Sequence, residues 1–454
     1  MPSDWFSRFA AGGMQRARST PLRRPRPGRT GPVLPPARPA TSVLLALLCL
    51  LPSCSEIEEP LDWRDSARGG LAETPITFAE SSAVAAHHSY PAYVITGGSS
   101  YMLAGVLDRG ALRLESSAYL RWDLDDLPEQ GTIERAYVQM VLRSAEQADS
   151  SVTGPYRLWM YDLAGSWAED SLETAPAPAD FIASSGEINT GGLTDTSDVL
   201  LNTLFEDPDL IDLVSDWRSG DKENQGVVLR PDDTSERGFL QLISREGSPR
   251  GVVTDVLTPA LVLEIDLGTK DTLITKEAVA DAYVMDVAGE VLIDESELLV
   301  SSGYVRRGLL ELTLADLLAA QPDSLPRGSV VHRATLALPI VTDSDWHLPS
   351  DETLTLYVYE TFDAWSPGVD PESISANYIS DAFISASDTT VVLDVRGPVQ
   401  RIFEGQDLTL FLRCAGEVGT FRSLLLTVGG AGARTPVLDV SISRPSPGRL
   451  GEGS

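Results

Sequence analysis

The sequence predicts an all-β protein with two tandem antiparallel β-sandwich domains of jelly-roll-like form, each with one short helix. Three observations predict this fold class. Apolar and polar residues alternate along many short segments, Gly, Pro, Asp and Ser separate those segments, and one order of anchor residues occurs twice in the chain. Alternation with period two is typical of strands that bury one face, and short strands between turns are typical of sandwiches.

A basic leader and a short apolar run precede the domains. The run VLLALLCLL covers residues 43–51 and follows eight arginines and a single acid, Asp4. A membrane-spanning helix needs about 20 apolar residues, so this run suits the core of a signal peptide instead. Residues 51–54, LPSC, resemble the lipobox of bacterial lipoproteins. We therefore expect residues 1–53 to be removed and Cys54 to carry the lipid, with cleavage as an ordinary signal peptide as the alternative.

Residues 54–74 are charged and show no apolar periodicity, which predicts a flexible tether. The residue after the cysteine is Ser55, not Asp. The resemblance to lipoprotein sorting then implies the outer membrane, on its periplasmic side or at the cell surface. The chain has a net charge of −31, and removal of the basic leader makes the remainder more acidic. Because nucleic-acid binding relies on Lys and Arg, a nucleic-acid partner is not expected.

Cys414 is the only cysteine after residue 54. A disulfide between two domain cysteines is therefore excluded, and each domain has to be stabilised by its apolar core. Cys414 ends the alternating run LTLFLRC, where we expect a small buried residue and not a nucleophile.

Two copies of one pattern follow the tether. Residues 127–167 match residues 325–365 at a constant offset of 198, which pairs Tyr161 with Tyr359. Upstream of these segments the strand AYLRWDL matches GLLELTL at an offset of 190. Near the end of each copy a Thr-Pro pair precedes another alternating run. A shared order of anchors with insertions confined to loops indicates a duplicated domain.

These copies and their flanks set the expected organisation. The boundary between the copies is placed in the polar stretch that begins at Gly268. The C-terminal residues are rich in Pro, Gly and Ser, which predicts disorder. The expected segments are a first sandwich domain over 75–267, a second over 270–443 and a disordered tail over 444–454.

One short helix is expected in each copy. In copy one, Asp207 is a suitable N-cap, Pro208 lies in the first turn and Gly220 ends the segment. Apolar residues on one face, of which Trp217 is the last, indicate an amphipathic helix. Its counterpart in copy two covers residues 398–405 with a weaker pattern.

Copy one resembles the DNRLRE-type domain, a carbohydrate-binding-module-like β-sandwich of bacterial and archaeal surface proteins. The segments that carry the resemblance are YLRWDL, LPEQGTIERAYVQM, WAEDSLET and DWRSGDKENQGVVLRP. In the last segment, Trp217, Gly220, Asn224 and Gly226 match the family's W-x-x-G…N-x-G pattern. The resemblance covers most of residues 77–267, whereas copy two keeps the strands but lacks this junction. It implies an extracellular module that attaches to sugars or surfaces.

Aromatic residues are the candidates for binding sugars, because aromatic faces pack on pyranose rings. Large aromatics also dominate protein cores, and we expect Trp167 and Trp217 in the interior. The better ligand candidates are aromatics on the outer faces of strands or in loops: Tyr119, Trp159, Trp346 and Tyr357.

The sequence contains no recognisable catalytic set and no metal-ligand set. His87 and His88 are adjacent and would point to opposite sides of a strand, and no Cys or His partner stands at zinc spacing. Acidic residues are abundant, as at Asp123, Asp125 and Asp126, and hard cations bind such oxygens. We expect no cofactor, with a structural calcium ion as the one candidate.

The expected function is that of a membrane-anchored extracytoplasmic lipoprotein. Its tandem non-catalytic modules would bind polysaccharide or another envelope component, and the lipid anchor would supply the membrane contact. The alternative is a polysaccharide-active enzyme with carboxylate catalysis in a cleft between the domains. Fold alone does not decide between them, because function resides in a site.

Overall fold

The computed structural model describes residues 73–79, 84–147, 155–172, 176–188, 201–235, 237–247, 258–268, 270–314, 330–348, 352–361, 375–404, 408–429 and 435–443. The predicted leader, Cys54 and the tail lie outside these residues, as does the tether before Glu73. All described elements belong to one compact unit, Arg64–Ser454. Within the described ranges, no helix has the length and apolar character needed to cross a membrane.

The described residues lie mostly in antiparallel strands, which confirms the predicted all-β class. The first strands are β1 (Glu73–Ala79), β2 (Val84–Pro91), β3 (Tyr101–Arg109), β4 (Leu112–Trp122), β5 (Thr132–Gln147), β6 (Leu158–Leu163), β7 (Pro178–Ser184), β8 (Leu201–Glu206), β9 (Val227–Pro231), β10 (Gly238–Ile243), β11 (Ala260–Asp266) and β12 (Asp271–Ala288). The later strands are β13 (Glu297–Ser301), β14 (Arg306–Leu312), β15 (Val330–Pro339), β16 (Thr353–Thr361), β17 (Ala376–Ser385), β18 (Thr390–Asp394), β19 (Leu408–Cys414), β20 (Ser423–Thr427) and β21 (Val437–Ser443). The helices among the described residues are α3 (Pro208–Ser219) and α5 (Arg396–Phe403).

The strands form two sandwiches with the same strand order. In the N-terminal sandwich the orders are β7-β6-β9-β4-β3-β10 and β12-β11-β5-β8, and β5 and β10 also pair. In the C-terminal sandwich they are β17-β16-β19-β14-β13-β20 and β1-β21-β15-β18. Equivalent strands have equivalent neighbours, as a duplicated domain requires.

The duplication extends to irregularities of the backbone. Between β5 and β11 the register skips Glu134, and between β15 and β21 it skips His332, 198 residues later. One extra residue in a strand of an antiparallel pair is a β-bulge, which bends that strand. A bulge at the same place in both copies shows that the offset found in the sequence also relates their backbone geometry.

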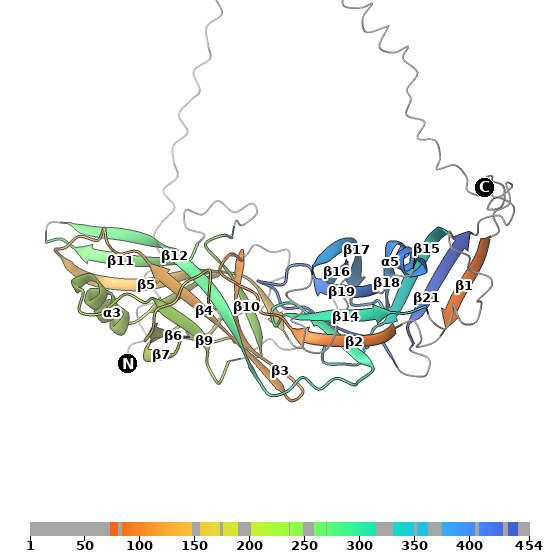
Figure 1. Ribbon diagram of the computed structural model, residues 1–454. Coiled ribbons are helices and arrows are strands. Elements are labelled where there is room, and N and C mark those ends of the chain that lie inside the picture. The colour runs from red at the N-terminus through yellow and green to blue at the C-terminus, as the bar shows by residue number, and fades with distance from the viewer. Residues whose placement is uncertain are drawn as a thin grey trace, which may run out of the picture. The chain divides into compact units, whose positions relative to one another are not determined.

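The predicted domain limits of 75–267 and 270–443 do not match the strand pairing. β1 and β2 come first in the chain but pair with β21 and β14 of the C-terminal sandwich. β12 begins the second copy but pairs with β11 and β4 of the N-terminal sandwich. In Figure 1 the orange strands β1 and β2 lie beside the later, blue and green strands β21 and β14. Each sandwich is therefore completed by the first strands of the other copy.

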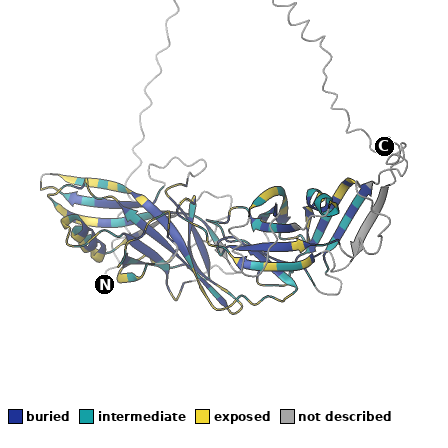
Figure 2. Cartoon of the chain, in the orientation of Figure 1, coloured by how far each residue is buried: buried dark blue, intermediate teal, exposed yellow. Residues whose placement is uncertain are grey.

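The buried faces follow the predicted alternation. Leu120 and Trp122 are at most 1% exposed, and Trp167 and Trp217 are also buried, as expected. Figure 2 shows buried residues concentrated along the strands and exposed residues at loops and strand ends. Cys414 is fully buried, and burial raises the pKa of its thiol, which fits the small interior residue that the sequence predicts.

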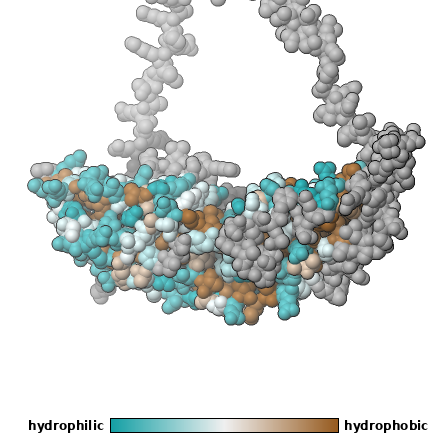
Figure 3. Space-filling model, in the orientation of Figure 1, coloured by the Kyte–Doolittle hydropathy of each residue, from teal (hydrophilic) through white to brown (hydrophobic). Residues whose placement is uncertain are grey.

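Helix α3 confirms the predicted caps. The Asp207 side chain accepts a hydrogen bond from the backbone N–H of Asp209 at 3.2 Å, and Gly220 ends the helix with a φ of 79°. Positive φ favours glycine, because it carries no Cβ. Helix α5 begins and ends two residues earlier than the predicted range 398–405, and its N-cap residue makes no side-chain capping bond. The face seen in Figure 3 is mostly hydrophilic, with separate hydrophobic patches, in keeping with the acidic composition.

Candidate ligand-binding surface

Two of the four predicted ligand candidates are buried, which corrects the expectation that all four stand on outer faces or in loops open to solvent. Tyr119 does point away from Leu120, on the outer face of β4, but only 2% of it is exposed. Trp167, in the loop after β6, packs against it with ring centroids 5.9 Å apart. The two residues belong to a small apolar cluster on the outer side of the sheet, with Leu172 and Val228. Burial also raises the pKa of the Tyr119 hydroxyl.

Trp346 is buried for a different reason. It follows β15 in a loop and is 5% exposed, within an apolar cluster made mostly of residues from the N-terminal sandwich. Its carbonyl accepts a hydrogen bond from Ser423 Oγ at 3.1 Å. Contacts between elements far apart in the sequence thus cover Trp346, and it is not a free stacking surface.

Trp159 lies in an aromatic cluster on the outer face of β6 and β7. Leu158 and Met160 point into the core, so Trp159 and Tyr161 point outward, and both are partly exposed. Phe181 of β7 is 47% exposed and contacts both, with ring centroids 6.1 Å from Trp159 and 5.8 Å from Tyr161. Trp159, Tyr161 and Phe181 are called the first aromatic cluster.

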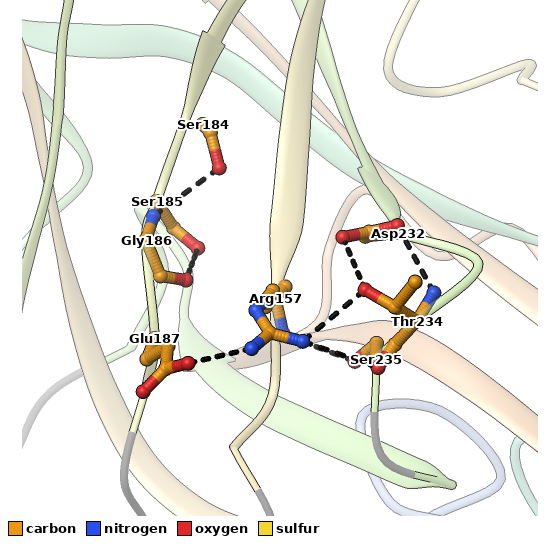
Figure 4. Close-up of polar contacts among 8 residues, drawn as sticks. All are labelled: Arg157, Ser184, Ser185, Gly186, Glu187, Asp232, Thr234 and Ser235. Atoms are coloured by element: carbon orange, nitrogen blue, oxygen red, sulfur yellow. Dashed lines mark hydrogen bonds and ion pairs between the residues drawn. The ribbon is translucent and has the colours of Figure 1, made fainter.

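Polar side chains flank the first aromatic cluster. Arg157, two residues before Trp159 and on the same side of the chain, donates to Glu187 Oε1 at 2.6 Å and to Thr234 Oγ1 at 3.1 Å (Figure 4). Thr234 Oγ1 in turn donates to Asp232 Oδ2 at 2.8 Å. The aromatic rings therefore lie beside fixed hydrogen-bonding groups, a combination typical of sites that bind sugars and other polar ligands.

Tyr357 lies in a matching cluster on β16 and β17. Tyr378 is 55% exposed, and its ring lies 6.0 Å from Tyr357 and 5.7 Å from Tyr359. Tyr357, Tyr359 and Tyr378 are called the second aromatic cluster. The Tyr378 hydroxyl donates to Asp381 Oδ1 at 2.6 Å, and this bond raises the pKa of Tyr378 to about 12. Both remaining sequence candidates, Trp159 and Tyr357, are therefore partly exposed and stand among other aromatics.

The two clusters occupy equivalent positions in the two copies. Tyr161 lies opposite Phe181, next to a register shift between Met160 and Tyr161. Tyr359 lies opposite Tyr378, next to a register shift between residues 358 and 359. The aligned positions are 198 residues apart on the inner strand and 197 on its partner. The same bulge therefore positions the same kind of ring pair twice.

An arginine lies across the next strand from each cluster. Arg230 of β9 is the cross-strand partner of Trp159, and Arg413 of β19 is that of Tyr357. Arg230 donates to Glu115, which neutralises its charge. Arg413 places its guanidinium 5.5 Å from the centroid of the Tyr359 ring, a favourable cation–π contact. Each cluster thus has an arginine on the strand next to its rings.

The sequence interpretation missed Tyr161, Phe181, Tyr359 and Tyr378 as members of these surfaces. The offset of 198 already paired Tyr161 with Tyr359, and this was a usable signal. Phe181 and Tyr378 also had a usable signal, because ADFIA over residues 179–183 matches ANYIS over residues 376–380 at an offset of 197. What the sequence does not show is that these segments pair with β6 and β16.

Three carboxylates meet at one place in the N-terminal sandwich. Oxygens of Glu169, Glu246 and Asp281 lie within 4.8 Å of one another. Arg245 fills the same place: its guanidinium is 3.0 Å from Glu169 and 2.7 Å from Glu246, and its backbone N–H donates to Asp281. The cluster therefore carries its own cation, and calcium binding stays a prediction. The sequence candidates Asp123, Asp125 and Asp126 are not part of it.

A second acidic surface lines a hollow of about 620 Å³ between the two copies. The end of β3 supplies Arg109, and the chain around β13 and after β15 supplies the acids. The charged residues that line the hollow are Arg109, Asp294, Glu297, Asp343 and Asp345. Burial lowers the pKa of Arg109, while Asp345 and Glu352 oppose this shift. The alternative, enzymatic prediction requires carboxylates in a cleft between the domains, and this hollow is a candidate for that cleft.

Comparison of the chain with protein-family models and with curated proteins finds no match. The resemblance to the DNRLRE-type domain therefore stays a prediction. Its Asn-x-Gly motif has a structural role: Asn224 Nδ2 donates to the carbonyl of Trp122 at 2.7 Å, and Asn224 Oδ1 accepts from the N–H of Gly226 at 3.1 Å. Gly226 has a φ of 85°, and a Cβ there would lie 2.1 Å from the carbonyl oxygen of Leu120.

Proposed function

We propose that the protein is a membrane-anchored, non-catalytic binding protein whose two aromatic clusters hold a polysaccharide or another glycan of the cell envelope. The observation that carries the proposal is the repetition of the exposed rings. Trp159, Tyr161 and Phe181 recur as Tyr357, Tyr359 and Tyr378, with the same bulge and the same neighbouring arginine.

Core packing does not account for these positions. Phe181 and Tyr378 are about half exposed, so their rings gain little from burial in the folded chain. A pyranose ring offers an apolar C–H face to an aromatic ring and hydroxyl groups to nearby donors and acceptors. Arg157 with Glu187 at the first cluster, and Arg413 with Asp381 at the second, are groups of the required kind.

A glycan array probed with the folded protein tests the proposal. Trp159→Ala and Tyr357→Ala each remove one central ring, and we expect each to weaken glycan binding at its own cluster by about tenfold, as loss of an anchoring aromatic does. The matched control is Tyr137→Ala, because Tyr137 is a partly exposed tyrosine on β5, outside both clusters. Binding to no glycan, or equal binding by all three variants, would contradict the proposal.

The anchor at Cys54 is tested separately. Labelled palmitate should be incorporated into the wild type and not into a Cys54→Ala variant, because only a lipobox cysteine is acylated. Equal labelling of both proteins, or labelling of neither, would contradict anchoring by lipid. This result does not depend on glycan binding.

The acidic hollow supports one alternative, a polysaccharide-active enzyme. Glycoside hydrolysis uses two carboxyl groups on opposite sides of the scissile bond, and the hollow offers several acids beside Arg109. An Asp294→Asn and Asp345→Asn double variant separates the two functions. Wild-type release of reducing ends that the double variant lacks would favour the enzyme, whereas binding without any release favours the aromatic clusters.

A further inference from the structure

The exchanged strands occupy equivalent places in the two sandwiches. β1 pairs with β21 from Glu73–Ser443 to Ala79–Val437, and the first part of β12 pairs with β11 from Asp271–Asp266 to Glu277–Ala260. These registers agree when β1 is aligned with β12 at the offset of 198 and β11 with β21 at an offset of 177, which is also the separation of the two Thr-Pro pairs. β1 therefore occupies in the C-terminal sandwich the position that the start of β12 occupies in the N-terminal sandwich.

The second part of the exchange repeats this agreement, including its bulge. β2 pairs with β14 and skips Ala85, while β12 pairs with β4 and skips Val279. His88 lies opposite Leu309, and Ala282 lies opposite Tyr119, at the offset of 190 that relates β4 to β14. β1 and β2 together are thus equivalent to β12.

The short turn between β11 and β12 determines which sandwich β12 belongs to. β11 ends at Asp266 and β12 begins at Asp271, and the N–H of Leu267 donates to the carbonyl of Lys270 at 3.2 Å. Gly268 adopts a φ of 78° in this turn. Antiparallel strands joined by so short a turn pair with each other. β12 is therefore held in the N-terminal sandwich, which leaves its place in the C-terminal sandwich to residues 73–91.

Specific contacts hold residues 84–91 in that place. Val84 is 8% exposed and belongs to the core of the C-terminal sandwich. Arg306 donates to Ser89 Oγ at 3.0 Å and to the Ser89 carbonyl at 2.7 Å, and Ser89 Oγ donates to the carbonyl of Leu299 at 2.7 Å. Backbone pairing, an apolar anchor and charge-assisted hydrogen bonds together make a binding site for an extended peptide.

We propose that the C-terminal sandwich contains a strand-acceptor site, formed by β14 and β21, whose ligand is the segment 73–91. The chain's own segment occupies the site, and the same segment of a second copy can replace it once the first is released. Exchange of an identical element between copies needs no new contacts, because the site is already complementary to it.

Cleavage of the full chain tests this site. A protease sequence is inserted after Gly98, which is exposed and where an added Cβ would meet open space. After cleavage the N-terminal piece should co-elute with the rest of the protein in buffer and leave it only in denaturant. Separation in buffer, with no change in the unfolding temperature of the remainder, would overturn the proposal.

Labelled peptide then tests binding in trans. After release of the piece, a fluorescent peptide of residues 73–91 should bind on return to buffer, as measured by anisotropy. A Val84→Asp peptide should bind at least about tenfold more weakly, since it buries a charge. An Ala85→Asp peptide should bind within about threefold of wild type, because Ala85 is the exposed bulge residue. Failure of the wild-type peptide, or equal binding of the Val84→Asp peptide, would refute the site.

Discussion

Trp159 and Tyr357 stand at the same position of the same strand in two copies of one domain, and each lies opposite an arginine of the neighbouring strand. The next outward residue on each strand, Tyr161 or Tyr359, faces an exposed aromatic of the outer strand. A solvent-facing arrangement that occurs in both copies suggests that both surfaces serve one task. Two equal sites for the proposed ligand would have consequences for binding that a single site does not.

Two sites should bind a polymer more tightly than a short oligosaccharide. Once one cluster has bound a long glycan, the other meets the same chain at a high effective concentration, and such linkage strengthens binding by about 10²–10⁴-fold. Tyr357→Ala, which weakens its own cluster by about tenfold, should therefore weaken binding of the polymer by about tenfold. For a short oligosaccharide it should only lower the stoichiometry in calorimetry, with the affinity of the remaining cluster unchanged. The same fractional loss for both ligands would contradict two independent sites.

Gly419 joins the two sandwiches. Its N–H donates to the Tyr283 hydroxyl at 2.8 Å, and its carbonyl accepts from Gln241 Nε2 at 2.6 Å. A Cβ at this residue would lie 2.6 Å from Ser99 Oγ, and the φ of 78° already favours glycine.

Gly419→Ala should therefore destabilise the protein more than Gly416→Ala. Gly416 has a similar φ of 64°, but no atom lies near its Cβ position. The Gly416→Ala variant therefore measures the cost of backbone strain alone, which is about 1–2 kcal/mol. We expect an additional loss of about 1–3 kcal/mol at residue 419 from the clash, measured by chemical denaturation. Equal losses for the two variants would show that the close approach is absent.

The ion pair between Arg307 and Glu417 is almost fully buried. Arg307 Nε and Nη2 each lie 2.7 Å from a carboxylate oxygen of Glu417, and neither residue is more than 8% exposed. Glu417→Gln should cost about 3–5 kcal/mol of unfolding free energy, because it leaves a buried charge without its partner. The matched control is Glu206→Gln, which breaks the exposed pair with Arg135 and should cost at most about 1 kcal/mol. Similar losses in both variants would argue against burial of Arg307.

Asp281 makes stability depend on pH. Burial raises the pKa of Asp281 to about 7, with Glu246 and Glu169 adding to the shift, although the N–H of Arg245 opposes it. The folded protein then holds a proton that the unfolded chain releases near pH 4. The stability that this proton contributes is complete below that pH and is lost as the pH rises to about 7.

Asp281→Asn should remove this dependence, because an amide does not titrate. Between about pH 4 and pH 8 the wild type should lose about 2–4 kcal/mol more unfolding free energy than the variant, as measured by urea denaturation across that range. Parallel pH profiles for the two proteins would mean that Asp281 titrates normally. A rise in the unfolding temperature on adding calcium, seen only in the wild type, would instead indicate a calcium site at this cluster.

Local patterns in the sequence were sufficient to predict the strands and helix α3. Alternation predicted the inward face with Leu120 and Trp122, and Asp207 and Gly220 predicted the helix ends. The partners of strands were not predictable in this way. β2 and the second part of β12 take equivalent places against β14 and β4, and only the short turn after Asp266 fixes β12 in the N-terminal sandwich. The burial of Tyr119 was also not predicted, because it depends on the packing of Trp167, from the loop after β6, against the outer face of β4.

The most direct test of this architecture is a pair of engineered cysteines across the exchanged strands. Ala86 lies opposite Glu311, at a Cα separation that antiparallel pairing keeps at about 4.5–5.5 Å, within reach of a disulfide. Without exchange, Ala86 would instead lie opposite Arg121, where Ala280 now lies. Oxidation of the Ala86→Cys, Glu311→Cys protein should form the intramolecular disulfide completely, and the Ala86→Cys, Arg121→Cys protein should form none. A disulfide in the second protein and none in the first would contradict the exchange of strands between the two sandwiches.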